Sequence, residues 1–422
     1  MLVYKFGGAS IATPERMTEL LPIIAEANKP LLVVVSALGK TTNALEDVVK
    51  AAFKGDKRKT SELIKQLEDQ HDEYCAALLQ GEALDTVKAE LHLIFTEMQW
   101  AADTATQYAF DYVYDQIVCL GELLSTTIFN SFLNSRQVPS AWVDARDIVR
   151  TDNTYRDAQV DEAYTTKQVK EKVLPLFQQY QVVVTQGFIG CTDENYSTTL
   201  GREGSDYSAA LFASMLPANS VTIWKDVEGL LNADPKLFAN TEKIQQISFY
   251  EVIEMAYYGA QVIHPKTIKP LHNNGIPLYV KCFLDRSLQG TVIKNEVETA
   301  YPPIIVLKKN QILLKVTSKD YSFVTEDKLS ELYTIFHQHK VKINLLQNAA
   351  ISLIACVDNN PAKIEPLISD LSLNYQIRRN EDAELLTIRH YNDPTFERLT
   401  KDRKVLLEQK SRVTVQAVMS NF

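Results

Sequence analysis

The distribution of apolar residues over the first 300 positions predicts a parallel sheet. Short segments rich in valine and isoleucine, with little polar alternation, suit strands that are covered on both faces. Helical patterns lie between these segments. The predicted strands are 1–6, 31–37, 181–189, 220–227 and 277–282. The predicted helices include 14–28, 204–216 and 249–258.

Residues 43–135 have a different pattern. This stretch is long, charged and rich in leucine and alanine, with few helix breakers. Apolar positions in "KRKTSELIKQLEDQHDEYCAALL" recur near helical spacing. We expect several helices packed at one edge of the sheet, as a lobe beside the active site.

The composition changes near residue 300, where "TAYPPIIVLKKN" contains two consecutive prolines. Beyond it, the pattern is strand, helix, strand, strand, helix, strand, and the same order then begins again and stops early. A βαββαβ unit forms a small open sheet with helices on one face. We therefore expect two domains, 1–300 and 301–422, with a truncated second unit in the latter.

Composition excludes several classes of protein. The chain has 422 residues, 45% of them hydrophobic, and a net charge of −9 spread along its length. That balance disfavours a nucleic-acid partner, which needs clustered Lys and Arg. Five widely spaced cysteines without a CxxC argue against a disulfide framework or a zinc site. No signal peptide or apolar run near 18 residues is evident, so we expect a cytoplasmic protein without a membrane partner.

Three loops with glycine and hydroxyl residues are candidates for chemistry. They are "KFGGAS" (5–10), "SALGKTTNAL" (36–45) and "GREGSDYSAAL" (201–211). In an open α/β sheet, ligands bind at the carboxyl ends of strands, where helix N-termini attract anions. Neither a Walker A motif nor a GxGxxG is present. Cationic side chains on these loops indicate a polyphosphate together with an anionic substrate.

Each candidate side chain also has an ordinary structural interpretation. Lys5 could point to solvent at a strand end, and Ser205 and Asp206 could cap a helix. Glu122 could be favoured by a helix dipole alone. His264, before a proline, is more typical of a structural turn. These alternatives stay open from the sequence.

Seven motifs resemble the ordered signature set of the aspartate kinases. They are "KFGGAS", "VVVSALGKTTNAL", "GELLST", "TQGFIG", "TTLGREGSDYSAAL", "DVEGLLNADPK" and "GAQVIHPKT". The resemblance covers roughly residues 2–295, and the rest is similar to the ACT regulatory region of these enzymes. It implies the three-layer α/β/α sandwich of the amino acid kinase fold, with a mainly parallel sheet, and a monofunctional enzyme. The implied reaction is the phosphorylation of L-aspartate by ATP with Mg²⁺, without a general base, since the acceptor carboxylate is already ionised.

The resemblance also implies roles for individual residues, but no metal ligands. Catalytic roles fall to Lys5 and Asp206. The residues implied in substrate binding are Ser36, Thr42, Glu122, Arg202 and Ser205. Those implied in nucleotide binding are Lys5, Gly7, Gly8, Lys225, Asp226, Asp234, Lys236 and Gln261.

This chain departs from the pattern of the family at several positions. Ala9 replaces a threonine, and Glu203 replaces the second glycine of "GRGGSD". Gln261 stands where relatives keep a lysine that faces the nucleotide phosphates. Losing one such charge typically costs about 10²–10³ in rate. Our hypothesis is that Lys225, where relatives commonly have threonine, supplies the missing charge.

The regulatory region departs as well. Where relatives often read "VDLITTSEVS", this chain reads "INLLQNAAIS". Asn344 replaces the acid, and Ala349 and Ala350 replace polar positions. A lysine effector would lose the partner of its ammonium group, so we expect weak or absent inhibition by lysine. We also expect a homodimer or larger homo-oligomer, because such units usually pair through sheet edges.

Two alternatives remain. One is another amino acid kinase, such as a glutamate or carbamate kinase, which "GREGSDYSA" together with ACT-like units disfavours. The other is a non-catalytic relative that binds aspartate or nucleotide for regulation. Glu203 and Gln261 favour this second alternative. The joint presence of four other residues argues against it: Lys5, Glu122, Arg202 and Asp206.

Overall fold

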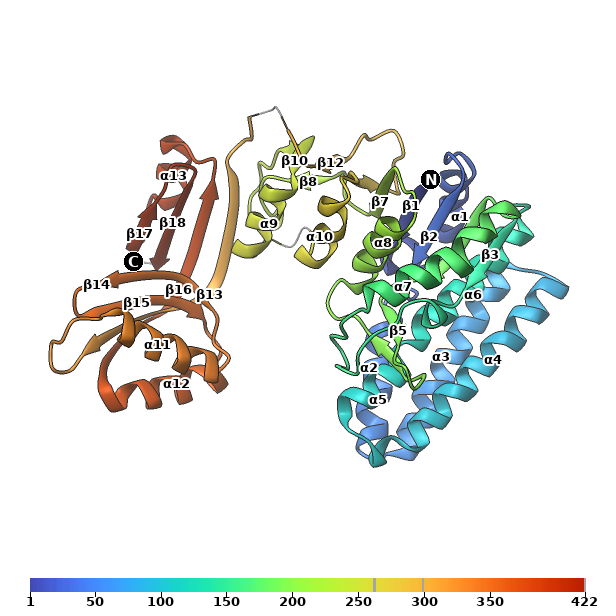
Figure 1. Ribbon diagram of the computed structural model, residues 1–422, viewed down its shortest axis with the longest axis horizontal. Helices are drawn as coiled ribbons and strands as arrows, with labels where there is room; N and C mark the ends of the chain where they lie inside the picture. Colours follow the sequence, from blue (N-terminus) through green and yellow to red (C-terminus); the bar gives the residue numbers. More distant parts are fainter. Residues whose placement is uncertain (261–262, 298–299, 421–422) are drawn as a thin grey trace. The chain divides into compact units, whose positions relative to one another are not determined.

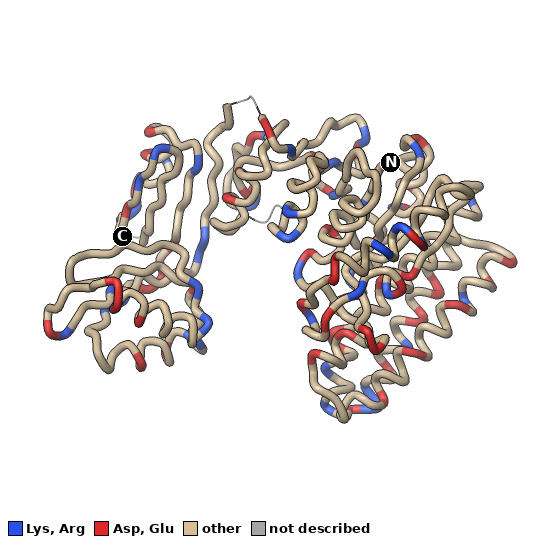
Figure 2. Tube along the Cα trace, viewed as in Figure 1, with Lys and Arg blue, Asp and Glu red and all other residues tan. Residues whose placement is uncertain are grey.

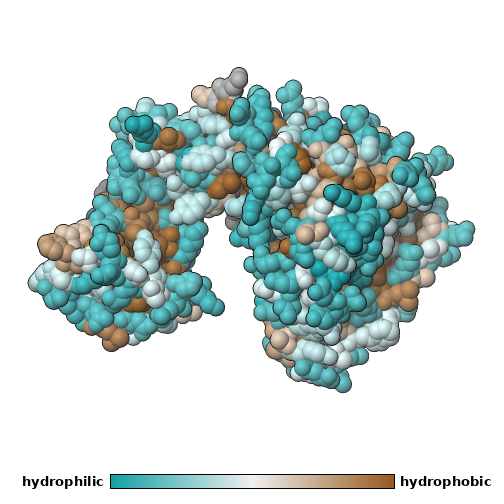
Figure 3. All heavy atoms as spheres, in the orientation of Figure 1, coloured by the Kyte–Doolittle hydropathy of each residue, from teal (hydrophilic) through white to brown (hydrophobic). Residues whose placement is uncertain are grey.

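The computed structural model describes residues 1–260, 263–297 and 300–420, and the chain forms two compact units (Figure 1). Unit 1 takes in residues 1–230, 245–253 and 263–297. Unit 2 takes in 231–244, 254–260 and 300–420. Basic and acidic residues are scattered along the chain in both units (Figure 2). On the face drawn in Figure 3, hydrophilic side chains cover most of unit 1.

Unit 1 contains an eight-stranded sheet in the order β10-β12-β11-β7-β1-β2-β4-β3. Neighbouring strands run parallel, except for the antiparallel pair β11 and β12. The five predicted strands are confirmed as β1, β2, β4, β7 and β11. The strand bounds are β1 Leu2–Phe6, β2 Leu31–Val35, β3 Ser140–Val143, β4 Val182–Gln186, β7 Ser220–Lys225, β10 Gln246–Ser248, β11 Leu278–Cys282 and β12 Thr291–Lys294.

Helices cover both faces of this sheet. Every residue of β2 is buried, and successive side chains of a strand point to opposite faces. Leu31, Val33 and Val35 belong to the core shared with α1 (Pro14–Ala25) and α6 (Leu120–Ser135). On the other face, α8 (Gly204–Met215) contacts β1, β2 and β7, and α10 (Pro265–Asn273) packs on α8. The result is the three-layer α/β/α sandwich expected from the sequence.

The predicted helices between 43 and 135 are present. They are α2 (Thr41–Phe53), α3 (Lys57–Leu78), α4 (Glu82–Asp103), α5 (Phe110–Val118) and α6. Helices α3 and α4 lie side by side, and α6 lies against β2, β3 and β4. The sequence predicts no membrane span, but by length and composition Phe110–Ser135 could cross a membrane, because it contains an 18-residue window with a mean hydropathy of 1.3. Of the most apolar 18-residue window in this segment, 83% is buried within the protein, which is typical of a core helix.

Unit 2 contains a six-stranded antiparallel sheet in the order β14-β15-β13-β16-β18-β17. Two of its strands, β13 and β16, are 15 residues long. The strand bounds are β13 Ile304–Ser318, β14 Ile343–Ala349, β15 Ser352–Asp358, β16 Tyr375–Arg389, β17 Lys404–Lys410 and β18 Thr414–Ser420. The helices of this sheet are α11 Glu326–Gln338, α12 Pro361–Asn374 and α13 Asp393–Thr400.

The two long strands divide this sheet into two halves that share them. The end of β13 and the start of β16 complete a βαββαβ unit with α11, β14, β15 and α12. The end of β16 continues into α13, β17 and β18. The sequence predicts that this second copy is truncated and lacks its usual final strand and helix. In the structure Ile304–Lys308, at the start of β13, pairs with Leu385–Arg389 and takes the place of the missing strand.

Two segments that precede residue 300 in the chain belong to unit 2. Ala233 and Phe238 share a hydrophobic cluster with Ile305. Helix α9 (Phe249–Tyr258) begins in unit 1 and ends in unit 2, where Glu254 forms a 2.7 Å ion pair with Arg389. These contacts explain why both segments group with the C-terminal strands.

The remaining strands and the remaining α-helix are short. They are β5 Ile189–Cys191, β6 Ser197–Thr199, β8 Leu230–Leu231, β9 Lys243–Ile244 and α7 Glu162–Gln168. Strand β5 pairs with β6, and β8 pairs with β9. Strand β6 leads directly into the loop before α8.

Candidate functional site

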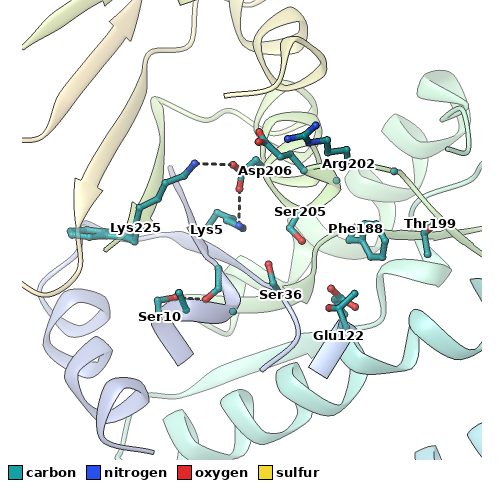
Figure 4. A pocket seen from close by; sticks show the side chains of 18 of the residues that line it. Lys5, Ser10, Ser36, Glu122, Phe188, Thr199, Arg202, Ser205, Asp206 and Lys225 are labelled. Atoms are coloured by element: carbon teal, nitrogen blue, oxygen red, sulfur yellow. Dashed lines mark hydrogen bonds and ion pairs between the residues drawn. The ribbon is translucent and has the colours of Figure 1, made fainter. Parts of the chain in front are cut away.

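A pocket of about 600 Å³ opens in unit 1 at the carboxyl ends of β1, β2, β4 and β7 (Figure 4). Eleven of the residues that the sequence nominates line it. They are Lys5, Gly7, Gly8, Ser36, Thr42, Glu122, Arg202, Ser205, Asp206, Lys225 and Asp226. The pocket lies where an open α/β sheet places its ligands.

The loops after β1 and β2 meet closely because one of them carries glycine. A Cβ atom at Gly8 would lie 2.8 Å from the carbonyl oxygens of both Ala37 and Gly39. The N–H of Gly39 donates to the carbonyl of Gly8 at 3.1 Å. A larger residue at position 8 would push these two loops apart.

Two lysines flank one buried aspartate. Lys5 Nζ lies 2.7 Å from Asp206 Oδ1, and Lys225 Nζ lies 3.8 Å from Asp206 Oδ2 (Figure 4). Burial opposes the ionisation of Asp206, but the two ammonium groups hold the pKa of its carboxyl below the usual value. The three side chains therefore bring a net positive charge into the pocket.

Glu122 has the opposite character. It lies in the first turn of α6 and is 3% exposed. Its Oε1 accepts a hydrogen bond from the N–H of Ala37 at 3.3 Å, while its Oε2 is buried with no hydrogen-bond partner. Burial raises the pKa of Glu122 to about 8, which the N–H of Ala37 and the charge of Lys5 only partly offset. A buried, unpartnered carboxylate oxygen in a pocket is suited to a cationic group of a ligand.

The loop before α8 presents Arg202 and Glu203 in different ways. Arg202 is exposed, and its side chain forms no hydrogen bond or ion pair with the described residues. Glu203 adopts φ 54° and ψ 27°, a left-handed conformation that favours glycine. Its Oε2 accepts a hydrogen bond from the backbone N–H of His264 at 2.8 Å. The acid therefore ties this loop to the start of α10.

The structure decides between several of the interpretations that the sequence leaves open. Lys5 has an 11% exposed side chain, so it does not point to open solvent. The N-cap of α8 is Glu203, so neither Ser205 nor Asp206 occupies that position. His264 caps α10, with its Nδ1 accepting from the N–H of Lys266 at 3.2 Å. This contact matches the turn role rather than a catalytic one.

Two nominated residues that the structure describes, Asp234 and Lys236, do not line this pocket. Asp234 and Lys236 are exposed and belong to unit 2, where Asp234 Oδ1 accepts a hydrogen bond from the N–H of Lys236 at 2.9 Å. That contact is typical of a turn. Gln261 lies outside the described residues.

The pocket also contains residues that the sequence does not nominate. They are Ala9, Ser10, Tyr114, Arg156, Phe188, Thr199, Gly201, Glu203, Gly204, Trp224 and Phe283. Phe188 belongs to the motif "TQGFIG" and Thr199 to the motif "TTLGREGSDYSAAL". Both could therefore have been predicted as site residues from these motifs. Tyr114 and Arg156 carry no such signal, because only the tertiary fold brings them to the site.

Comparison with known proteins gives a consistent result. Residues 1–282 match the model of the amino acid kinase family. The chain is 31% identical over 361 residues to the lysine-sensitive aspartokinase 3 of Escherichia coli, covering 85% of this chain and 78% of that protein. It is 29% identical over 397 residues to an aspartokinase of Chlamydia pneumoniae, covering 92% and 85%.

The solved structures point the same way. The structure of E. coli aspartokinase III in complex with aspartate and ADP (R-state) superposes with a TM-score of 0.82 at 26% identity, covering 100% of this chain and 96% of the other. The chain also matches bifunctional aspartokinase/homoserine dehydrogenases of Zea mays and Arabidopsis thaliana, and spans 32% and 35% of their lengths.

Proposed function

The chain belongs to the amino acid kinase family and, within it, to the aspartokinases, and from this premise we propose the following function and mechanism. The protein is an aspartate kinase, which transfers the γ-phosphoryl group of ATP to the side-chain carboxylate of L-aspartate. The products are 4-phospho-L-aspartate and ADP. The observation that carries this proposal is one pocket with a buried, unpartnered Glu122 oxygen and the Lys5, Asp206 and Lys225 cluster.

The chemistry needs positioning more than proton transfer. A carboxylate with an ordinary pKa of about 3.9 is already ionised at neutral pH, so it attacks phosphorus without a general base. Phosphoryl transfer passes through a loose transition state whose charge lies on the phosphoryl oxygens. A site for this reaction must hold two anions in line and neutralise their repulsion.

We assign the recognition of aspartate to the side of the pocket that contains Glu122 and Arg202. Glu122 Oε2 has no partner, so it is placed to receive the α-ammonium group. The Arg202 guanidinium suits the α-carboxylate, since its planar donors match a carboxylate in pairs. Ser36, Thr42 and Ser205 also line the pocket, and we assign their hydroxyl groups to the same substrate.

We assign the phosphates to the side that contains the two lysines. Lys5 stands at the end of β1, followed by Gly7 and Gly8, whose backbone N–H groups suit phosphate oxygens. Asp206 holds the ammonium of Lys5 at 2.7 Å and so orients it. Lys225, at the end of β7, adds a second cation at the same carboxylate.

ATP enzymes of this kind use Mg²⁺, which neutralises phosphate charge when bound. Mg²⁺ is usually held by one or two carboxylates plus substrate phosphates rather than by a cage of protein ligands. Asp226 lines the pocket beside Lys225 and fits such a role. Among the described residues no group of three His, Cys, Asp or Glu side chains is arranged to hold a metal ion.

We extend the proposal to the setting of the enzyme. The product is the activated acid from which the aspartate-family amino acids lysine, threonine and methionine are made. Residues 301–422 are assigned as a regulatory ACT-like region, and the enzyme as a cytoplasmic homodimer or larger homo-oligomer. The edges of the six-stranded sheet, β14 and β17, are the strands available for such pairing.

One assay tests the function. The protein is incubated with MgATP and aspartate, glutamate or carbamate, and the acyl phosphate is trapped with hydroxylamine. Hydroxamate from aspartate alone is the expected result. Product from glutamate or carbamate instead would support a different amino acid kinase. No product from any acceptor would support a binding protein without catalysis.

A further inference from the structure

A buried carboxylate lies behind the wall of the pocket and has no place in the mechanism above. Asp115, on α5, is 0% exposed and does not line the pocket. Its Oδ2 accepts hydrogen bonds from the N–H groups of Arg156 at 3.0 Å and Thr199 at 2.8 Å. Its Oδ1 accepts from the hydroxyl of Thr199 at 2.7 Å. Arg156 and Thr199 both line the pocket.

The next residue of α5 extends this contact along β6. Gln116 Nε2 donates to the carbonyl of Ser197 at 2.8 Å, and its Oε1 accepts from the N–H of Ser197 at 3.1 Å. Backbone groups of a short strand need partners, and here two side chains of a helix supply them. Asp115 and Gln116 therefore take the place of a neighbouring strand.

The segments held in this way form one wall of the pocket. The N–H of Ala158 donates to the carbonyl of Thr199 at 3.0 Å, so the loop with Arg156 is bound to β6. Gly201 allows a close approach, because a Cβ atom there would lie 2.7 Å from Asp157 Oδ1. Arg202 follows three residues after Thr199. The position of β6 therefore determines the position of the Arg202 backbone, from which the guanidinium group extends.

We propose that Asp115 is a positioning residue for the amino-acid substrate, which acts through Thr199 and Arg156 to fix the wall from which Arg202 extends. This proposal rests on the proposed function. Lys5, Asp206 and Lys225 come from β1, α8 and β7, whereas the hydrogen bonds of Asp115 within the described residues go to Arg156 and Thr199. Loss of the Asp115 contacts therefore weakens aspartate binding and leaves the phosphoryl transfer step nearly unchanged.

The charge of Asp115 predicts a pH dependence of aspartate binding that a purely structural packing role would not produce. Burial raises the pKa of Asp115 to about 6. The hydrogen bonds from Arg156 and Thr199 and the charge of Arg156 lower this pKa and offset the effect of burial only in part. The other titratable groups that face it are Tyr155, Tyr114 and Cys119, and burial raises the pKa of each above its ordinary value. None of them titrates near pH 6. Hydrogen bonds to an ionised carboxylate are stronger than those to a neutral one, so the wall loosens as Asp115 takes up a proton.

The test compares Asp115→Asn and Asp115→Ala with the full-length wild-type protein. Asparagine keeps an oxygen for the two N–H groups and removes the charge, whereas alanine leaves the donors without an acceptor. The matched control is Asp69→Asn, an exposed carboxylate on α3 that pairs with Lys65. The KM for aspartate, the KM for ATP and kcat are measured from pH 5 to 8. The Kd for aspartate is measured by calorimetry, which requires no turnover.

At pH 7.5 we expect the KM and Kd for aspartate to rise roughly tenfold or more in Asp115→Ala and a few-fold in Asp115→Asn. We expect kcat and the KM for ATP to stay within about threefold, and Asp69→Asn to behave as wild type. The wild-type KM for aspartate should approach that of Asp115→Asn as pH falls below 6. If Asp115→Ala does not fold, the proposal is still tested by comparing the KM for aspartate of Asp115→Asn and wild type across the pH range.

Two results would overturn the proposal. One is an unchanged KM and Kd for aspartate in Asp115→Asn at every pH. The other is a fall in kcat with unchanged aspartate affinity. A wild-type protein that makes no hydroxamate would instead contradict the proposed function, and the Kd comparison would still test the role of Asp115.

Discussion

Glu203 and His264 are joined by a 2.8 Å hydrogen bond from the backbone N–H of His264 to the Glu203 carboxylate. This contact explains an acid in a loop that otherwise suits anions. The carboxylate satisfies a backbone group at the start of α10 rather than projecting toward a ligand as a free charge. It does so from a left-handed backbone that is strained for any residue with a Cβ atom.

The first prediction concerns this balance of strain and hydrogen bonding. Glu203→Ala keeps the left-handed conformation and loses the hydrogen bond, whereas Glu203→Gly loses the bond but relieves the strain. We expect the alanine variant to be less stable than the glycine variant by about 1–2 kcal/mol. Urea denaturation of the two variants measures the difference. Equal stabilities would show that the backbone at position 203 is not strained.

The second prediction concerns Lys225. Because Lys225 Nζ lies 3.8 Å from Asp206, beside Lys5, we expect Lys225→Ala to lower kcat by about 10²–10³ with a small change in the KM for aspartate. Lys225→Arg should retain part of the rate. Gln261→Ala should change turnover little, as expected from the sequence. Steady-state kinetics measures these effects.

The control for Lys225 is Lys281→Ala, on the neighbouring strand β11, which does not line the pocket. This variant should keep the wild-type rate. Near-normal turnover in Lys225→Ala would rule out the compensating charge. A large effect in Gln261→Ala would mean that the glutamine itself serves the reaction.

The third prediction concerns a proton. Burial raises the pKa of Glu122 to about 8, so the free enzyme holds a proton there at pH 7. An α-ammonium group bound at Oε2 favours the ionised form, and the proton must leave. Calorimetry at pH 7 in two buffers of different ionisation enthalpy should show net proton release upon aspartate binding. Glu122→Gln should bind aspartate more weakly and release no proton. Equal proton release by the wild-type and variant proteins would show that the proton comes from another group.

The fourth prediction follows from the same group in the absence of substrate. The pKa of Glu122 is raised from 4.5 to about 8 in the folded state. Between these values the unfolded chain has lost the proton that the folded protein keeps, so the contribution of Glu122 to stability falls as pH rises. The slope is at most about 1.4 kcal/mol per pH unit.

Denaturation at pH 5, 6.5 and 8.5 tests this dependence. Glu122→Gln has no proton to lose and should gain stability relative to wild type as pH rises through this range. A difference between the two proteins that does not vary with pH would contradict the prediction.

The fifth prediction concerns inhibition by lysine. The Asn344 side-chain oxygen accepts from Lys308 Nζ at 2.9 Å, and its nitrogen donates to Gln311 and Asp358, each at 2.9 Å. The amide is therefore committed within the sheet and has no negative charge for an effector ammonium group. We expect millimolar lysine to change activity by less than about twofold. Strong inhibition in the hydroxamate assay would overturn this expectation.

The predictable parts of the fold and site are those set by short stretches of chain. Runs such as Leu31–Val35 identify buried strands, and glycine-rich loops after them place Lys5 and Ser36 at one edge of the sheet. Contacts between distant segments follow no such local pattern. Asp115 and Thr199 are hydrogen-bonded although they are 84 positions apart in the sequence. No local sequence pattern near either residue predicts this contact. Asp234 and Lys236 show the converse, since membership of a motif does not place them in this pocket.

The two strands that pass through both halves of the C-terminal sheet limit how that region can be divided. A fragment that ends between the halves would cut β13 and β16, each 15 residues long, in mid-strand. Both pieces would then expose unpaired backbone groups along a new edge, which is a template for aggregation. We therefore expect that this region can be removed or exchanged only as a whole, although its sequence resembles one and a half repeats.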